Sequence, residues 1–455
     1  MSQPHTFLPP SRGLLLAAAC AWLAPAYGQD MPRVRQTIAT LASPAYQGRG
    51  YVRGGDQKAA AYLRQRFQEL GLQPLAPNYT QPFALDVNTF PGRLQLELSF
   101  GALRFPGLSS SRRLRPGQDF IAAPESGGGK VGGPFSAVPV WQFDTLAFTN
   151  ASVQQQLLRR PWHNGGFVLR ATDERRLSTL PLPVRQHLDS AALRLTLVPK
   201  LTASLAAEQV SQMRLEVLDS VWNYVPSSGP TVALVTARVE AVLQRQYQTQ
   251  NIVGYLPGRV QPDSFLVVTA HYDHLGTMGR RTYFPGANDN ASGTATLLEL
   301  AAYYARPENR PAYSLVFVGF GAEEAGLVGS KYFTEHPLVP LPRIRFLLNL
   351  DLLGTGSEGA TVVNGRVFEK QFQQLQQLNA AHQYLPSLAA RGRAANSDHY
   401  YFSERGVPAF FLYTRGGPTA YHDVHDRPES LPLTAFPKLF FLLRDFLNLQ
   451  GAAAR

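Results

Sequence analysis

The sequence predicts an α/β fold: a three-layer α/β/α sandwich with a mixed, largely parallel central sheet, plus an inserted, mostly β domain. Near-continuous apolar runs at 264–271, 313–320 and 345–351 are typical of central strands that are covered on both faces. Patterns of helical spacing lie between these runs, and strands that alternate with helices indicate a largely parallel sheet. From about 116 to 245, short β-like runs are interrupted by proline and glycine, which indicates an insert.

The first 28 residues have the layout of a secretory signal peptide. Arg12 precedes an apolar run that is too short to span a membrane, and the small residues Ala26 and Gly28 precede the expected cleavage point. We therefore expect an exported protein, periplasmic or extracellular, with no membrane span. In the alternative interpretation the protein is a lipoprotein anchored through Cys20, the only cysteine. Cleavage after Gly28 leaves no thiol for catalysis or metal binding.

The remaining chain is divided into one domain at 29–115 and 246–455, and the insert at 116–245. In the first part, Asp56 is the expected N-cap of a helix that ends before Gly71, and 93–100 alternates like a strand. In the second part, helices are expected at 293–305, 325–336 and 370–382, with a last helix from about Phe436 to Leu447.

The composition argues against a disordered protein and against a nucleic-acid-binding protein. Hydrophobic residues make up 44% of the chain and charged residues 16%, which favours a packed globular protein over a disordered one. The formal net charge is +11, but the arginines are dispersed without a Lys/Arg block. Dispersed positive charge is typical of a solvated surface, so a nucleic-acid partner is not expected. The oligomeric state is not predicted.

Three predicted strands deliver histidine and carboxylates to one edge of the sheet. The run at 264–271 ends in His271 and is followed by Asp273, the run at 313–320 precedes Glu323 and Glu324, and the third run ends at Asp351. In open α/β sheets, binding sites form beyond the carboxyl ends of the strands. A loop adds Asp289, and the stretch "TAYHDVHD" adds His422 and His425.

So many carboxylates in one place predict a metal centre. Unpaired carboxylates that lie close together disfavour one another's ionised forms, and divalent cations remove that repulsion. Imidazole together with carboxylate favours zinc, whereas magnesium and calcium prefer oxygen ligands alone. Two cations would relieve the repulsion better than one, because a bridging carboxylate can serve both.

These residues resemble the co-catalytic dizinc exopeptidases, a metallopeptidase family of secreted bacterial aminopeptidases related to glutamate carboxypeptidase and glutaminyl cyclase. The matching pieces are "AHYDHLG", "GANDNASG", "GAEEAGLVGS", "NLDLLG", "SDHYYF" and "AYHDVHD", in the family's order. The resemblance covers roughly 249–455, and more loosely 41–85. It implies a zinc exopeptidase fold for the domain at 29–115 and 246–455, and it allows a protease-associated domain at the position of the insert.

The resemblance also implies roles for individual residues. One zinc ion would be held by His271 and Asp351, and a second by Glu324 and His422, with Asp289 bridging them. Glu323 would be the general acid and base. Further implied features are Asp273 as the group that orients His271, Tyr421 as a stabiliser of the oxyanion, and a cis peptide bond at Asp289–Asn290.

Other polar residues near these motifs are assigned supporting roles. His422 is preferred to His425 as ligand because it follows Tyr421 and precedes Asp426 by four residues, as in the family. We expect His274 and His399 to be structural or to line the pocket, and Asp398 to help shape it.

The predicted function is that of an exported metallo-aminopeptidase acting on peptides with a free N-terminus. Glutaminyl cyclisation with a single zinc ion and carboxypeptidase or dipeptidase activity are alternatives on the same scaffold. A non-catalytic binding protein is less favoured, because such relatives lose ligands and this chain keeps every expected one. A serine hydrolase is excluded by the lack of a nucleophile elbow.

Overall fold

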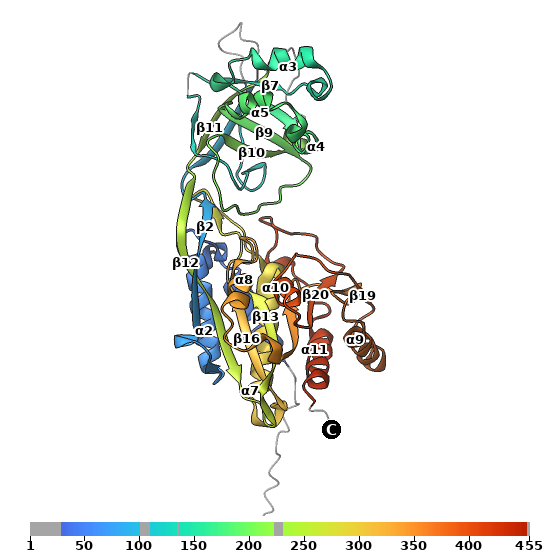
Figure 1. Cartoon of the computed structure of the whole chain (residues 1–455). Helices are drawn as coiled ribbons and strands as arrows, with labels where there is room; N and C mark the ends of the chain where they lie inside the picture. Colours follow the sequence, from blue (N-terminus) through green and yellow to red (C-terminus); the bar gives the residue numbers. More distant parts are fainter. Residues whose placement is uncertain (1–28, 101–109, 134–135, 223–230, 453–455) are drawn as a thin grey trace, which may run out of the picture.

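A computed structural model of the protein describes residues 29–452 except 101–109, 134–135 and 223–230 (Figure 1). The predicted signal peptide and Cys20 lie outside the described residues. Figure 1 shows two bodies stacked along the long axis of the molecule, with the long strands β2 (Thr80–Thr89) and β12 (Val242–Leu256) running between them. These two strands pair antiparallel from Thr80–Ile252 to Thr89–Val242, and they connect the two bodies.

The lower body is built on the predicted mixed sheet, which is parallel at its centre and antiparallel towards its edges. Its strands follow the order β1-β12-β16-β13-β17-β20-β18-β19, and β2 pairs with β12. The central pairs β16·β13, β13·β17 and β17·β20 are parallel, whereas β12·β16 and β18·β20 are antiparallel. The remaining bounds are β1 Gln73–Pro74, β13 Gln261–His271, β16 Tyr313–Phe320, β17 Ile344–Leu350, β18 Gly359–Val363, β19 Leu388–Ala390 and β20 Ala409–Arg415.

Helices cover both faces of this sheet, which confirms the predicted three layers. On one face, Leu266 and Val268 of β13 share an apolar core with the larger group of helices. On the other face, Val267 packs with Phe333 and Phe402 of two shorter helices. The first group is α1 Met31–Leu41, α2 Gly55–Glu69, α7 Gly293–Ala305, α9 Glu369–His382 and α11 Phe436–Gln450, and the second is α8 Val328–Glu335 and α10 His399–Glu404.

The upper body contains a second sheet, in the order β4-β3-β11-β7-β8-β9-β10-β5, with β6 on β11. The predicted insert boundary at 116 is wrong for this sheet, because β3 and β4 precede residue 116 and are joined to the sheet through the β3·β11 and β3·β4 pairings. The β3·β11 pairing joins segments far apart in the chain. The strands are β3 Leu94–Phe100, β4 Ser110–Arg113, β5 Phe120–Ala122, β6 Gly129–Val131, β7 Val138–Gln142, β8 Gly166–Arg170, β9 Leu193–Val198, β10 Met213–Leu218 and β11 Thr231–Val239.

The insert is more mixed than the mostly β domain that we predicted. Strands β7, β8, β9 and β10 are successively parallel. Parallel strands need crossover connections, and helices lie in two of them here: α3 Ala151–Leu158 between β7 and β8, and α4 Ala171–Glu174 with α5 Leu182–Asp189 between β8 and β9. The short helix α6 Asp219–Trp222 follows β10. We call the body from about residue 93 to 240 the inserted domain.

One predicted helix cap is wrong. Gly54 is the N-cap of α2, and Asp56 lies in its first turn, fully buried. The carboxylate of Asp56 instead accepts hydrogen bonds from Tyr247 (2.6 Å) and Thr249 (2.9 Å) of β12. The neighbouring strand therefore captures the side chain that would otherwise cap the helix. The predicted end is confirmed, since Gly71 follows α2 with φ +71°.

Candidate metal centre

The carboxyl ends of three adjacent strands form the floor of the candidate site. Strand β13 lies between β16 and β17 and is parallel to both, with His271 in register with Phe320 and Thr269 in register with Asn349. The residues that follow these strands therefore meet at one edge of the sheet. The structure brings together His271, Glu323, Glu324 and Asp351 at that edge, as predicted.

Asp289 lies between two histidines. Its Oδ1 is 3.4 Å from Nε2 of His271, and its Oδ2 is 3.1 Å from Nε2 of His422. Nε2 of His271 is also 3.4 Å from Asp351 Oδ1, and Nε2 of His422 is 3.1 Å from Glu324 Oε2. Each oxygen of Asp289 thus faces a separate imidazole–carboxylate pair. The peptide bond Asp289–Asn290 is cis, as the family resemblance implied.

The donor atoms of the cluster fit divalent metal ions. Nε2 of His271 and Oδ1 of Asp351 are buried and have no hydrogen-bond partner within the described chain. Ligand atoms of His271, Glu323 and Asp351 lie within 4.8 Å of one another, as do those of His271, Asp289 and Glu324. Buried polar atoms without partners are costly unless something pairs with them, and imidazole with carboxylate is a zinc-type donor set. These two groups share His271, so they differ in part from the ligand sets implied by the resemblance.

The two adjacent glutamates have opposite electrostatic settings. Burial raises the pKa of Glu323 well above its ordinary value, and the charges of Glu324 and Asp398 reinforce this, against His271. Burial also acts to raise the pKa of Glu324, but the neighbouring imidazoles of His422 and His274 lower it to about 2. Glu324 is therefore held as an anion, whereas Glu323 is poised to carry a proton.

Asp273 supports the site by its main chain as well as its carboxylate. Nδ1 of His271 lies 3.3 Å from the carbonyl oxygen of Asp273 and 3.8 Å from its Oδ1, so only the carbonyl is within hydrogen-bond range. The carboxylate accepts the backbone N–H of Glu323 (3.1 Å) and the hydroxyl of Tyr51 (3.0 Å). Asp273 thus joins the ring of His271 to the turn that carries Glu323.

The two C-terminal histidines, His422 and His425, lie in different surroundings. His422 enters the cluster, and its Nδ1 donates to the carbonyl of Ala203 in the inserted domain at 2.9 Å. His425 is exposed and takes no part in the cluster. The ring of Tyr421 is 42% exposed and stacks on His422 at 3.9 Å between centroids. A hydrogen bond from Nδ1 to a carbonyl fixes the imidazole tautomer that leaves Nε2 free for a metal.

Several supporting residues were not predicted to act here. Arg49 is fully buried and donates to the carbonyls of Gly286 (2.8 Å) and Asp289 (3.0 Å), among others. Asp426 accepts the backbone N–H of Asn288 (2.8 Å) and Asp289 (3.0 Å). Together they fix the loop that carries Asp289. In the sequence, Asp426 is informative only through its spacing from His422. Arg49 lies within the segment 41–85, which matches the family loosely, and no motif there identifies it.

A hydrogen-bonded chain also holds Asp351. Ser397 donates to Asp351 Oδ2 at 3.0 Å, and Asn349 donates to Ser397 at 2.8 Å. The bonded oxygen is Oδ2, so Oδ1 is left facing His271. His274, expected to be structural or to line the pocket, forms a hydrogen bond with Glu324 Oε1 through Nδ1 at 2.6 Å. It therefore has a direct contact with the site.

Asp398 and His399 lie behind the cluster. Both are fully buried, and neither side chain has a hydrogen-bond partner in the part of the chain that the structure describes. Burial raises the pKa of Asp398 to about 7 and lowers the pKa of His399 to about 4. Both groups are thereby shifted towards their neutral forms, as burial favours, and the charges of Asp273 and Asp351 add to the shift at Asp398.

A pocket of about 190 Å³ opens onto the cluster. Its polar wall consists of His271, Asp289, Glu323, Asp351 and His422. The other lining residues are Leu352, Phe411, Tyr413, Tyr421, Asn396 and Arg391. The pocket thus combines carboxylates and imidazoles with apolar and aromatic side chains, one guanidinium and one amide.

Comparison with known proteins gives consistent matches. Residues 251–447 match the model of peptidase family M28. Over 213 residues the chain is 32% identical to "Aminopeptidase YwaD" of Bacillus subtilis, which covers 43% of this chain and 44% of that protein. It is 31% identical over 165 residues to "Leupeptin-inactivating enzyme 1" of Streptomyces exfoliatus, covering 36% and 35%. The matched region thus spans less than half the length of these curated relatives.

Solved structures match over almost the whole chain. A zinc aminopeptidase from Bacillus subtilis superposes with a TM-score of 0.64 at 18% identity, covering 93% of this chain and 95% of that one. A peptidase M28 precursor from Shewanella amazonensis superposes with a TM-score of 0.66 at 14% identity, covering 94% and 95%. At these identities the likeness establishes the shared fold, including both bodies of the molecule.

Proposed function

Because residues 251–447 belong to peptidase family M28, we propose that the protein is an exported zinc aminopeptidase that removes N-terminal residues from peptides. The observation that carries the proposal is the position of Asp289. Its two carboxylate oxygens face His271 and His422, each of which lies beside a second carboxylate, and Glu323 lines the same pocket. The N-terminal sequence supports export.

Two zinc ions are proposed for this centre. His271 and Asp351 would hold one ion, Glu324 and His422 the other, and Asp289 would contact both. Zinc bound there supplies Lewis acidity, which polarises a carbonyl oxygen and lowers the pKa of water. The hydrogen bonds that His271 and His422 make through Nδ1 leave Nε2 of each ring directed at Asp289.

Glu323 is the proposed general base and acid. A carboxylate with a raised pKa can take a proton from the attacking water and return it to the departing amine. Asp273 holds the backbone of Glu323, which keeps its carboxylate in place. Tyr421, beside His422 at the exposed side of the pocket, would donate to the oxyanion that forms at the scissile carbonyl.

The pocket favours a peptide with a free N-terminus. A protonated α-amine is attracted by the carboxylates that line one wall, whereas an acylated terminus has no charge to offer. The side chain of the first residue would lie against Leu352, Phe411 and Tyr413. A volume of about 190 Å³ suits one amino-acid side chain better than a longer segment.

A panel of substrates tests the proposal: aminoacyl-p-nitroanilides, free dipeptides and their N-acetylated counterparts, each assayed with and without a chelator. We expect cleavage of substrates with a free amine, loss of activity with chelator, and recovery on adding zinc. Turnover confined to N-acetylated substrates would contradict the aminopeptidase assignment. Cyclisation of N-terminal glutamine by a protein holding one zinc ion would favour glutaminyl cyclase instead.

A further inference from the structure

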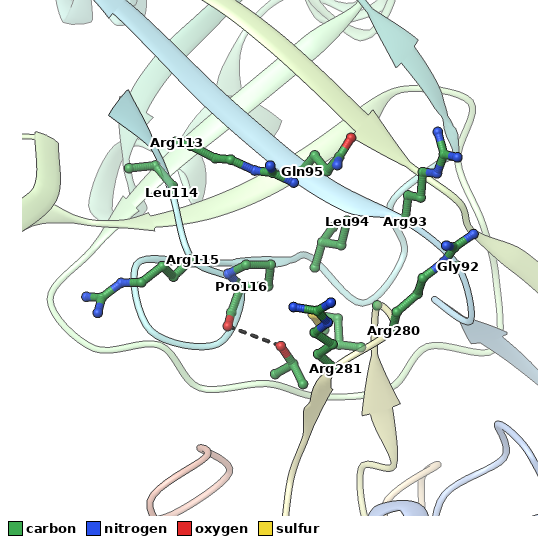
Figure 2. Close-up of a pocket in the computed structure, with 13 residues that line it drawn as sticks. Gly92, Arg93, Leu94, Gln95, Arg113, Leu114, Arg115, Pro116, Arg280 and Arg281 are labelled. Atoms are coloured by element: carbon green, nitrogen blue, oxygen red, sulfur yellow. Dashed lines mark hydrogen bonds between the residues drawn. The ribbon is translucent and has the colours of Figure 1, made fainter. Parts of the chain in front are cut away.

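Five arginines line a cavity of about 530 Å³ outside the metal centre (Figure 2). Arg93, Arg113 and Arg115 belong to the inserted domain, whereas Arg280 and Arg281 lie in the turn between β14 (Thr277–Met278) and β15 (Thr282–Tyr283). We call this site the arginine cavity. Figure 2 shows Arg113 above and Arg280 and Arg281 of the β14–β15 hairpin below, whereas Arg115 points away to the left, so two parts of the chain bring positive charge to the cavity.

Asp119, Glu240 and Glu97, the last opposite Arg113 in the β3·β4 pair, offset part of this charge. Arg115 pairs with Asp119 (Nε–Oδ2 3.0 Å), and Glu240 at the rim binds the backbone N–H of Arg93 and the guanidinium of Arg238. Within the described chain, the guanidinium groups of the other four arginines make no hydrogen bond or ion pair, and no carboxylate lines the cavity. Like charges gathered in one cavity repel, and a bound anion would relieve that repulsion.

We propose that the arginine cavity binds a small polyvalent oxyanion, with two or more phosphate or carboxylate groups, that joins the inserted domain to the β14–β15 hairpin. Guanidinium groups bind such oxyanions through paired N–H donors. The volume lies within the range of small-molecule pockets. The five arginines are exposed and can reach a ligand from solvent, while the buried side chains of Leu94, Leu114 and Met278 also line the cavity.

The surroundings favour a small ligand over an acidic polymer. A neighbouring cavity shares Gln95 and Arg113 with the arginine cavity, but there Glu97 lies beside Lys130 and Arg238. Glu97 interrupts the positive charge there, and Arg238 is already paired with Glu240 (2.6 Å), so the charge is weaker than in the arginine cavity, whereas a polymer would need a continuous track. A compact ligand needs only the arginines that line the arginine cavity.

The arginine cavity is separate from the metal centre. It shares no lining residue with the pocket at the metal centre. It is connected to that centre in sequence, because the β14–β15 hairpin lies between His274, which bonds Glu324, and Asp289. The hydroxyl of Thr282 in the hairpin donates to the carbonyl of Pro116 in the inserted domain at 3.2 Å, so the two walls are already in contact. A ligand bound there would not compete with substrate.

Calorimetric titration of the zinc-loaded full chain tests the proposal, with tripolyphosphate and benzene-1,3,5-tricarboxylate as the phosphate and carboxylate probes. We expect saturable binding of at least one probe, with one ligand per chain and an affinity that falls as salt is raised. R280Q/R281Q should weaken this binding at least about tenfold, because two charge-assisted contacts are lost. R93Q/R113Q, on the opposite wall, should do the same.

The matched control is R35Q/R64Q, which removes the same charge from helices α1 and α2, away from the cavity, and should change the affinity less than about twofold. Thermal melting adds a second readout, since the ligand should raise the melting temperature of the wild type and of the control but not of the cavity variants. Absence of saturable binding by the wild type would overturn the proposal. So would binding that survives both cavity variants, which places the probe elsewhere, or binding only of a long polymer such as polyglutamate.

Discussion

The metal centre and the inserted domain both bury charged residues, but they balance the charge in different ways. In the inserted domain, Arg194 pairs with Glu174 (2.5 Å) and Glu125 (3.5 Å), and Arg214 pairs with Glu125 (2.8 Å). At the metal centre, the carboxylates of Asp289 and Asp351 lie beside imidazoles and pair with no arginine of the described chain, and Nε2 of His271 and Oδ1 of Asp351 are left without a partner there. Arginine neutralises the first cluster within the protein, whereas cations are proposed to neutralise the second.

Arg49 shows that the difference does not arise from a shortage of arginine. It is fully buried near Asp289, yet it donates to backbone carbonyls instead of to the carboxylates. Its charge fixes the shape of the loop and leaves the side-chain oxygens of Asp289 available. In the functional cluster, Oδ1 of Asp351 is therefore left unpaired, whereas the carboxylates of the inserted domain are paired with arginine.

The largest expected effect is on catalysis. Glu323→Gln keeps the size of the side chain but removes the proton acceptor, so we expect the turnover rate to fall by about 10²–10⁴-fold. The zinc content and the melting temperature should stay close to wild type, because Glu323 is not a proposed ligand in the preferred assignment. Steady-state kinetics with metal analysis measures both. Near-normal turnover would remove Glu323 from its role.

The second prediction concerns the ion pairs of Arg194 in the inserted domain. Arg194→Ala leaves Glu174 and Glu125 in a partly buried setting without their shared partner. After allowance for their partial exposure, we expect the free energy of unfolding to fall by about 2 kcal/mol. Chemical denaturation measures this, with the exposed neighbour Arg175→Ala as control. Equal effects of the two substitutions would show that the ion pairs do not stabilise the domain.

The third prediction separates the two C-terminal histidines. His422→Ala removes a proposed ligand, so zinc affinity should fall at least about 10–100-fold, by comparison with losses seen when supporting groups are removed. His425→Ala is the matched control, because that side chain is exposed and lies outside the cluster. Competition titration with a chromophoric chelator gives both affinities. A larger loss in the His425 variant would reverse the assignment.

The smallest expected effect depends on pH. Burial, with the charges of Glu174 and Glu125, raises the pKa of Glu216 to about 7 in the folded protein. A carboxyl whose pKa is raised on folding opposes folding when it ionises, so its penalty is absent below its ordinary pKa and complete above about 7. Glu216→Gln should therefore raise the melting temperature at pH 8 by a few degrees and leave it unchanged at pH 4. A gain that is the same at both pH values would contradict this origin.

Much of the metal centre could be predicted because its residues follow directly after recognisable strands. His271, Glu324 and Asp351 each come just after an apolar run, and parallel strands bring such positions to one edge. The contacts of Arg49, Ala203 and Ser397 could not be predicted. They join segments far apart in the chain through carbonyls and hydroxyls, which leave no local pattern.

The predicted start of the insert at residue 116 is wrong for a related reason. Strand β3 was recognised from its alternation, but its membership of the second sheet depends on pairing with β11, which lies far along the chain. Local pattern identifies a strand and does not name its partner. The prediction of Asp56 as a helix N-cap is wrong for the same reason, because the hydroxyls of Tyr247 and Thr249 in β12 donate to its carboxylate.

The zinc content of the purified full chain tests the central claim most directly. After saturation with zinc and dialysis against metal-free buffer, elemental analysis should find two zinc ions per chain, since two imidazole–carboxylate pairs share Asp289. Asp289→Asn should lower that number while leaving the fold intact by circular dichroism. One tightly held ion per chain, or none, would contradict the account that the buried carboxylates of this centre are balanced by two cations.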